Sequence, residues 1–222
     1  ASGRKTRIEG FVSANTGSMP RQYQLVSPVD GSLVRRFGDL DLDATNLVVG
    51  GQLIQDIAGN LQAVAAAQYV YNKRDIADRR APGLLDSTFD YRAFNPKAGL
   101  IWSPSKNVRY YAIVSRSAEA PTFWQLVDLG PGSVPASPAS LYLMTKPLKM
   151  QEAMTFEIGT QQRGERFAWE ATFFHSRVKN ELIAEVQNFA IDGTTVNYDH
   201  PTVHQGVELS FNARTAGGVL SR

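Results

Sequence analysis

Three histidines could hold a metal ion, and two of them lie close together in the sequence. His200 and His204 are four residues apart, a spacing that lets two imidazoles share one ion on a helix. Pro201 and the alternating residues after it predict an extended segment instead, in which residues i and i+4 lie about 13 Å apart. We therefore expect hydrogen-bonded or solvated histidines, and no metal site.

Methionines and paired carboxylates form two further groups. Met144, Met150 and Met154 could suit Cu(I) through their thioethers. Because Met154 lies on the apolar side of an alternating segment, packing is the better interpretation. The candidate carboxylate pairs are Asp41 with Asp43 and Asp75 with Asp78. Arginines are close to them, and we interpret them as solvated surface. The segment Arg74–Arg80 could bind an anionic chelate, although a solvated loop is favoured.

The sequence contains no signature of a catalytic centre. It lacks the G-x-S-x-G, H-E-x-x-H, Walker and G-x-G-x-x-G patterns, and it has no cysteine for a nucleophile or a disulfide. We therefore expect no enzyme and no cofactor. The balance of 23 Lys and Arg against 21 Asp and Glu, without a basic run, argues against a nucleic-acid partner. The sequence lacks a run of 18 apolar residues, so we expect no membrane-spanning helix. Ala1–Gly10 does not resemble a signal peptide.

Alternation of apolar and polar residues is the dominant pattern, and it predicts β-strands. It is clearest over Phe94–Ser103, Met154–Gln161 and Val203–Arg214. Further strands are expected at Val108–Arg116, Phe167–Phe173, Leu61–Tyr71, Thr6–Ser13, Arg21–Ser27 and Asp43–Gln55. Many reach about 10 to 12 residues, which suits a membrane-spanning strand of about 9 to 11 better than a globular strand of about 5 to 6.

The connections between the expected strands alternate in length. Long connections are expected at about 72–91, 117–151 and 179–201, with short turns between them. An outer-membrane barrel has such an alternation, because its turns are short on one side of the membrane and its loops are long on the other. A soluble sandwich has no reason for it.

Five segments, in order along the chain, resemble TonB-dependent outer-membrane receptors. They are FNPKAGLIW (Phe94–Trp102), SRSAEAPTFWQ (Ser115–Gln125), LKMQEAMTFEIG (Leu148–Gly159), ATFFHSRVKNEL (Ala171–Leu182) and QGVEL (Gln205–Leu209). The resemblance implies an all-β, antiparallel, up-and-down transmembrane barrel of 22 strands. Residues 1–222 would supply roughly nine to ten of these strands as part of one barrel domain. We find neither the family's plug domain nor its TonB box in the chain, and expect an internal segment of the barrel.

The resemblance also implies a function. It predicts active uptake of a scarce nutrient, most often a ferric siderophore, across the outer membrane of a Gram-negative bacterium. The expected partners are the chelate, the TonB complex acting through the absent plug, and outer-membrane lipid with lipopolysaccharide. The candidate ligand-binding residues are Phe123, Trp124, Tyr142 and Met144, in the longest connection.

Packing of these side chains within the loop is the alternative to ligand binding. Two other functions stay open on the sequence alone: a passive porin or small barrel, and a soluble all-β binding or adhesion module.

Overall fold

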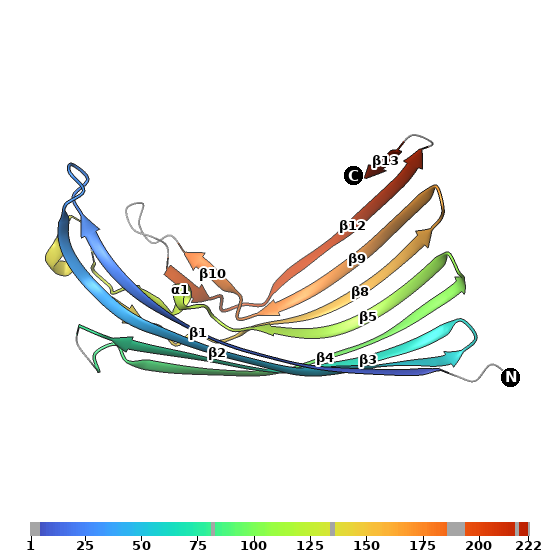
Figure 1. Ribbon diagram of the computed structural model, residues 1–222, viewed down its shortest axis with the longest axis horizontal. Coiled ribbons are helices and arrows are strands. Elements are labelled where there is room, and N and C mark those ends of the chain that lie inside the picture. Colours follow the sequence, from blue (N-terminus) through green and yellow to red (C-terminus); the bar gives the residue numbers. More distant parts are fainter. Residues whose placement is uncertain (1–4, 81–82, 134–135, 186–193, 216–217, 222) are drawn as a thin grey trace.

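The computed structural model describes residues 5–80, 83–133, 136–185, 194–215 and 218–221. Nine strands form one antiparallel sheet in the order β1-β2-β3-β4-β5-β8-β9-β12-β13, curved into a trough (Figure 1). The strands are β1 (Thr6–Val26), β2 (Leu33–Ala58), β3 (Leu61–Asp78), β4 (Ser87–Ser105), β5 (Val108–Glu119), β8 (Gln151–Arg163), β9 (Phe167–Lys179), β12 (Thr202–Thr215) and β13 (Gly218–Ser221). The predicted all-β, up-and-down barrel segment is confirmed, with β1 and β13 as the two edges of an open sheet.

Smaller elements lie within the two long connections. They are α1 (Phe123–Leu126), β6 (Val127–Leu129), a 3-10 turn (Pro138–Ser140), β7 (Leu143–Thr145), β10 (Leu182–Glu185) and β11 (Thr194–Asn197). β6 pairs with β7, and β10 pairs with β11, each as a two-stranded hairpin. Among the described residues, no helix is long and apolar enough to cross a bilayer.

The register divides the sheet into an apolar convex face and a more polar concave face. Residues paired across neighbouring strands share a face, so alternation along each strand becomes rows across the sheet. One convex row contains Ala63, Leu100, Ala112, Ile158, Phe173 and Val207. The neighbouring concave row contains Val64, Gly99, Ile113, Glu157, Phe174 and Gly206.

The convex face is unusually exposed for its composition. Trp102, Leu209 and Phe94 have 50%, 79% and 56% of their surface accessible. Trp102 and Tyr110 stack with ring centroids 5.3 Å apart near the short turns. In the described part of the chain no second sheet covers this face. Transmembrane β-barrels present such an apolar belt to lipid.

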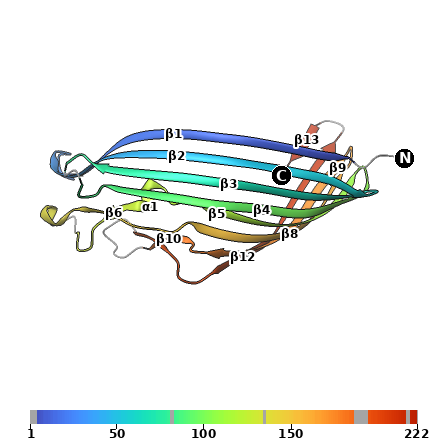
Figure 2. The ribbon, with the colours of Figure 1, turned by 90° about the horizontal axis from the view of Figure 1, so that it is seen from below.

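The strands join by short turns at one end (Figure 2). At the other end β1 and β2 join through residues 27–32 and β3 and β4 through residues 79–86, beside the two long connections. The expected long connection at 72–91 is wrong in its bounds, because β3 continues to Asp78 and β4 begins at Ser87. The expected strands Thr6–Ser13 and Arg21–Ser27 are likewise two ends of one strand, β1. In both regions polar residues occupy the two faces, so alternation is lost although the backbone ladder continues.

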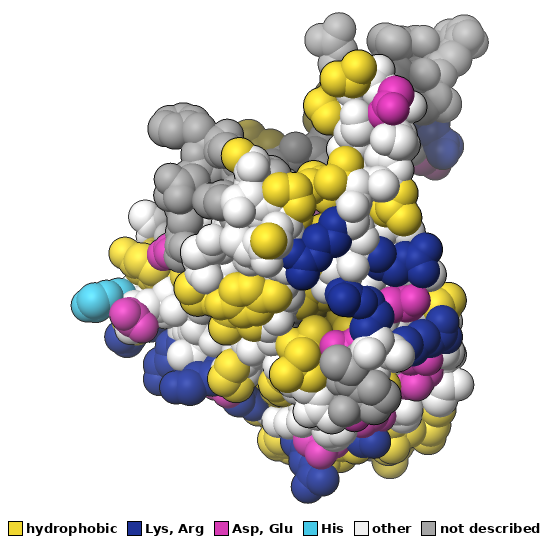
Figure 3. Space-filling view, turned by 90° about the vertical axis from the view of Figure 1, so that its left-hand side faces the viewer, with side chains coloured by type: hydrophobic (Ala, Val, Ile, Leu, Met, Phe, Trp, Pro, Cys, Tyr) yellow, Lys and Arg dark blue, Asp and Glu magenta, His cyan; other side chains and the backbone are white. Residues whose placement is uncertain are grey.

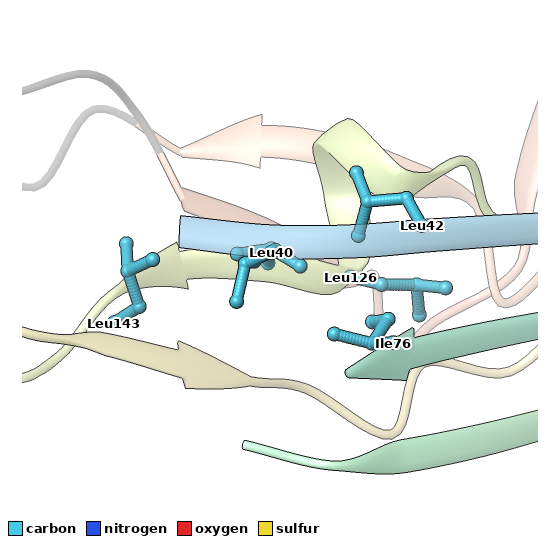
Figure 4. Close-up of a cluster of buried hydrophobic side chains, with 6 residues drawn as sticks. Leu40, Leu42, Ile76, Leu126 and Leu143 are labelled. Carbon is cyan, nitrogen blue, oxygen red and sulfur yellow. The ribbon is translucent and has the colours of Figure 1, made fainter. Parts of the chain in front are cut away.

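One cluster of buried side chains lies on the concave side, near the long-connection end (Figure 4). Leu40 and Leu42 of β2 and Ile76 of β3 contribute the sheet side of the cluster, and each is at most 3% exposed. Leu126, Val127 and Leu143 come from residues 120–150 and cover them. The longest connection therefore folds into the trough and does not extend away from it.

Candidate functional site

The candidate site is built by residues 120–150, which we call the inner connection. It leaves β5 at Glu119, crosses the concave face of β2, β3 and β4, and returns to β8 at Gln151. Its apolar side chains, such as Leu126 and Leu143, remove the sheet's own apolar residues from water. The cluster holds the rest of the inner connection in place.

Local hydrogen bonds give the inner connection its shape. The Thr122 backbone N–H donates to Gln125 Oε1 over 2.8 Å, and the Gln125 N–H donates to the Thr122 carbonyl over 3.0 Å, which caps the single turn of α1. The Lys146 N–H donates to the Leu126 carbonyl over 2.8 Å and extends the pairing of β6 with β7. A buried proline, Pro121, precedes this turn.

A cavity of about 520 Å³ opens between the inner connection and the ends of β2 and β3. Its lining consists of Arg35, Phe37, Asp78, Arg80, Leu84, Leu85, Leu141, Tyr142, Leu143, Met144 and Thr145. Arg35 donates a hydrogen bond from Nη1 to the carbonyl of Pro138, which ties one cation to the inner connection. Figure 3 views this end of the molecule, where Lys and Arg side chains lie beside large hydrophobic ones. Cations and apolar surface together suit an anionic ligand with a bulky organic body.

Two of the four candidate ligand-binding residues lie at this cavity. Tyr142 and Met144 line it. The Tyr142 hydroxyl donates to the Pro131 carbonyl over 3.0 Å, and its ring lies so close to Gly130 that an added Cβ would meet it at 1.9 Å. Gly130 is therefore required for the position of this ring. Whether Tyr142 and Met144 bind ligand stays a prediction.

The other two candidates lie apart from the cavity. Phe123 is partly buried against the apolar cluster, as the alternative of packing within the protein expects. Trp124 is 66% exposed, and its ring centroid lies 3.2 Å from Arg21 Cζ. The same guanidinium lies 4.3 Å from the ring centroid of Tyr23. Arg21 is thus held between two aromatic rings, an arrangement that stabilises a partly dehydrated cation.

Sequence reasoning missed one cavity arginine, Arg35, and placed the other, Arg80, in a segment for which a solvated loop was favoured. Arg35 lies in a segment without alternation, and Arg80 follows the end of β3. Within the segment Arg74–Arg80, only its last arginine and Asp78 line the cavity. Arg79 instead pairs with Asp41, through its Nε at 2.6 Å from Oδ2. The basic composition of this segment indicated a candidate anion site. Which of its arginines lines the cavity and which faces solvent depends on the strand register.

An ion pair within the inner connection is hydrogen-bonded to the β10–β11 hairpin through Thr194. Lys146 Nζ lies 3.0 Å from Asp128 Oδ2, and the Thr194 hydroxyl donates to the same oxygen. Burial by itself raises the pKa of Asp128, but the hydrogen bonds from Thr194 and Lys146 outweigh it, and the pKa of this carboxyl is lowered. Its charged form therefore stabilises the contact between the two connections.

The histidines lie apart from one another. His175 of β9 contacts Gln205 on the neighbouring strand, with Nδ1 3.1 Å from Oε1. His204 Nε2 lies 3.1 Å from Glu181 Oε1, and hydrogen bonds from Thr202 first and then His204 lower the pKa of Glu181. Within the described ranges no three His, Asp or Glu side chains come together as a metal site.

Comparison with known proteins connects this geometry to one family. Residues 7–221 match the family model described as TonB dependent receptor-like, beta-barrel. No curated protein is similar enough to count as a match.

Solved structures with the same fold include the ferric-catecholate import receptor Fiu from E. coli K12 (17% identity, TM-score 0.64, 95% of this chain and 33% of that one). The copper transporter OprC is 13% identical with a TM-score of 0.70, over 96% of this chain and 33% of that one. The ferric yersiniabactin uptake receptor FyuA from Yersinia pestis is 13% identical with a TM-score of 0.63, over 97% and 30%. The chain thus spans a third or less of the length of these structures.

Proposed function

The chain belongs to the family of TonB-dependent receptor-like β-barrels, and from this premise we propose that it forms part of an outer-membrane receptor that imports a scarce nutrient. The protein is a transporter and not an enzyme in this proposal. The apolar convex face contacts the lipid of a Gram-negative outer membrane, including lipopolysaccharide. The concave face surrounds a plug domain, through which the TonB complex drives uptake.

The observation that carries the proposal is the cavity at the long-connection end of the trough. It is lined in part by the inner connection, which folds inward against the sheet and leaves a hollow of about 520 Å³. A loop that only connected two strands in solvent would not need a buried cluster to hold it inside the trough. A ligand arriving from outside the cell meets this cavity before it meets the lumen.

The chemistry of the cavity favours a ferric siderophore as the ligand. Arg35 and Arg80 supply two cations against one carboxylate, that of Asp78. Guanidinium groups bind carboxylate and catecholate-type oxygens with charge-assisted hydrogen bonds. The ring of Tyr142 and the thioether of Met144 would contact the organic body of the chelate. Among the proteins of the same fold, Fiu is a ferric-catecholate import receptor and FyuA is a ferric yersiniabactin uptake receptor.

The test is binding and uptake of a ⁵⁵Fe-labelled catecholate siderophore by cells that carry the full-length receptor. We expect R35Q/R80Q to weaken binding by about 10-fold to 100-fold, because each lost charged hydrogen bond removes about 1.5 to 3 kcal/mol, partly offset by water. The matched control is R36Q/R79Q, which changes the two neighbouring arginines that do not line the cavity.

Two outcomes would contradict the proposal. Equal siderophore binding by R35Q/R80Q and R36Q/R79Q would show that the ligand does not bind in the cavity. Uptake that continues at full rate after a protonophore abolishes the membrane potential would favour the passive porin, because TonB-driven transport needs an energised inner membrane.

A further inference from the structure

A second group of cations lies on the convex face, where the apolar belt ends near the long connections. On four strands the first charged convex residue beyond the belt is basic: Lys73 on β3, Arg92 on β4, Arg116 on β5 and Arg177 on β9. We call these residues and Lys179 the border cations. They follow aromatic or aliphatic residues on the same face, such as Phe94 and Val114. A basic border directly above an apolar belt is the arrangement that attracts anionic headgroups.

Three of the border cations surround one hollow. Pairing places Arg116, Met154 and Arg177 in one row across β5, β8 and β9. Lys179 lies one step further along β9, opposite Glu152 of β8. A hollow of about 140 Å³ is lined by Arg116, Glu152, Ala153, Met154, Arg177 and Lys179.

The charges at this hollow do not balance. Arg116 is engaged, because its Nη2 lies 2.9 Å from Glu152 Oε1 and its Nη1 donates to the Phe94 carbonyl. Arg177 and Lys179 are both exposed, and neither forms a hydrogen bond or an ion pair with any part of the chain that the structure describes. Three cations therefore share one carboxylate, and two of them are available to an anion.

The surroundings of these two cations select the kind of anion. Met154 and Val203 lie on either side of Arg177 in the same row, and they are 51% and 55% exposed. An anion bound there has apolar surface beside it and the lipid-facing belt below it. Arginine and lysine place their aliphatic stems along such surface while the charged group reaches the headgroup level. A lipid phosphate satisfies both requirements, whereas free phosphate would use only the charges.

We propose that the hollow formed by Arg116, Arg177 and Lys179 binds a phosphate of the phosphorylated glucosamine headgroup of lipopolysaccharide. The proposal rests on the membrane orientation given under Proposed function, in which the long connections face the cell exterior. It goes beyond general lipid contact, because it assigns the headgroup to one place on β5, β8 and β9.

The test measures lipid A binding to the full-length receptor in detergent by native mass spectrometry. The probe is hexa-acylated lipid A with both phosphates, titrated against wild type and the R177Q/K179Q variant. We expect R177Q/K179Q to bind about 30-fold more weakly, which follows from two lost surface cations at an anionic interface. The charge-conserving variant R177K/K179R should bind as wild type does, which separates the loss of charge from any loss of folding.

The matched control is K106Q/R163Q at the opposite end of the strands. Lys106 and Arg163 line a hollow of about 130 Å³ beside the short turns, with similar size and charge. We expect lipid A binding by this control to equal that of wild type, because its hollow lies at the short-turn end and its lining residues Arg109 and Gln161 belong to the concave face, away from the apolar belt.

Three results would overturn the proposal: unchanged binding by R177Q/K179Q, equal weakening by K106Q/R163Q, or displacement of lipid A by millimolar inorganic phosphate. A receptor that binds lipid A as expected but no ferric siderophore would contradict the proposed ligand alone.

Discussion

Replacing Leu126 with alanine is expected to release the inner connection from the sheet while the barrel wall stays folded. Leu126 is 0% exposed and packs in the cluster with Leu40, Ile76 and Leu143. Truncating a fully buried leucine costs about 2 to 5 kcal/mol, through lost burial and the cavity left behind. Since the contact is between one connection and the sheet, the cost reduces the stability of the inner connection and not that of the strand ladder.

The size of the effect follows from this cost. A loss of about 3 kcal/mol raises the population of the open inner connection about a hundredfold. The assay is amide hydrogen exchange of the full-length receptor in detergent, read at the Lys146 amide, which is hydrogen-bonded to the Leu126 carbonyl. Exchange there should accelerate by the same factor, and siderophore binding should weaken, because Leu143 belongs to both the cluster and the cavity lining.

The control for the exchange measurement is L84A, which removes the same atoms from a leucine that is 75% exposed. Because Leu84 lines the cavity, this variant is not a control for siderophore binding. We expect little change in exchange at Lys146 in this variant. If L126A and L84A gave the same exchange rate, the buried cluster would not be what holds the inner connection, and the reasoning would be refuted.

Two further predictions concern other contacts. The pKa of Asp128 is lowered in the folded protein, so its contribution to stability is present above the unfolded pKa of about 3.9 and is lost as pH falls through the lowered pKa. Trp124 fluorescence should therefore report an acid transition below about pH 4, and D128N should remove this transition. An identical transition in D128N would contradict this reasoning. A Cβ at Gly159 would meet the Tyr111 ring at 2.3 Å and disturb the 2.6 Å contact between Tyr111 Oη and Thr172 Oγ1. G159V should therefore lower the free energy of unfolding by about 1 to 3 kcal/mol. The measurement is the temperature at which the heat-induced mobility shift occurs on gels. The control G17V has open space around its Cβ and should leave the shift unchanged; equal shifts would show that the ring moves freely.

The strands of the apolar belt were predictable from the sequence because each has a continuous row of apolar side chains on one face only. Val203–Arg214 and Phe94–Ser103 show this alternation, and both lie in strands of the structure, β12 and β4. The segment Leu61–Ala67 has high helix propensity, yet it forms part of β3, because its alanines pair with residues of two neighbouring strands. Tertiary pairing decided against local propensity there.

The ends of the strands could not be predicted in the same way. Beyond the belt both faces of β3 carry polar residues, as at Lys73 and Arg74, and no period remains in the sequence. The pairing continues because backbone groups form the ladder whatever the side chains are. The cavity was hidden for a related reason: Arg35 and Arg80 are distant in sequence, and only the register of β2 and β3 brings them to one hollow.

The order of strands in the sheet has a consequence for how fast the chain can fold. Most strands pair with the strand before them across a short turn, so these hairpins can form locally, one after another. The pairing of β5 with β8 must wait for residues 120–150, and this segment is about four times as long as residues 79–86 between β3 and β4. Closing the longer loop costs about 1 kcal/mol more in chain entropy. The apolar cluster of the inner connection offsets this cost only after β2 and β3 are paired, so the β1–β5 half should form before β8 joins it.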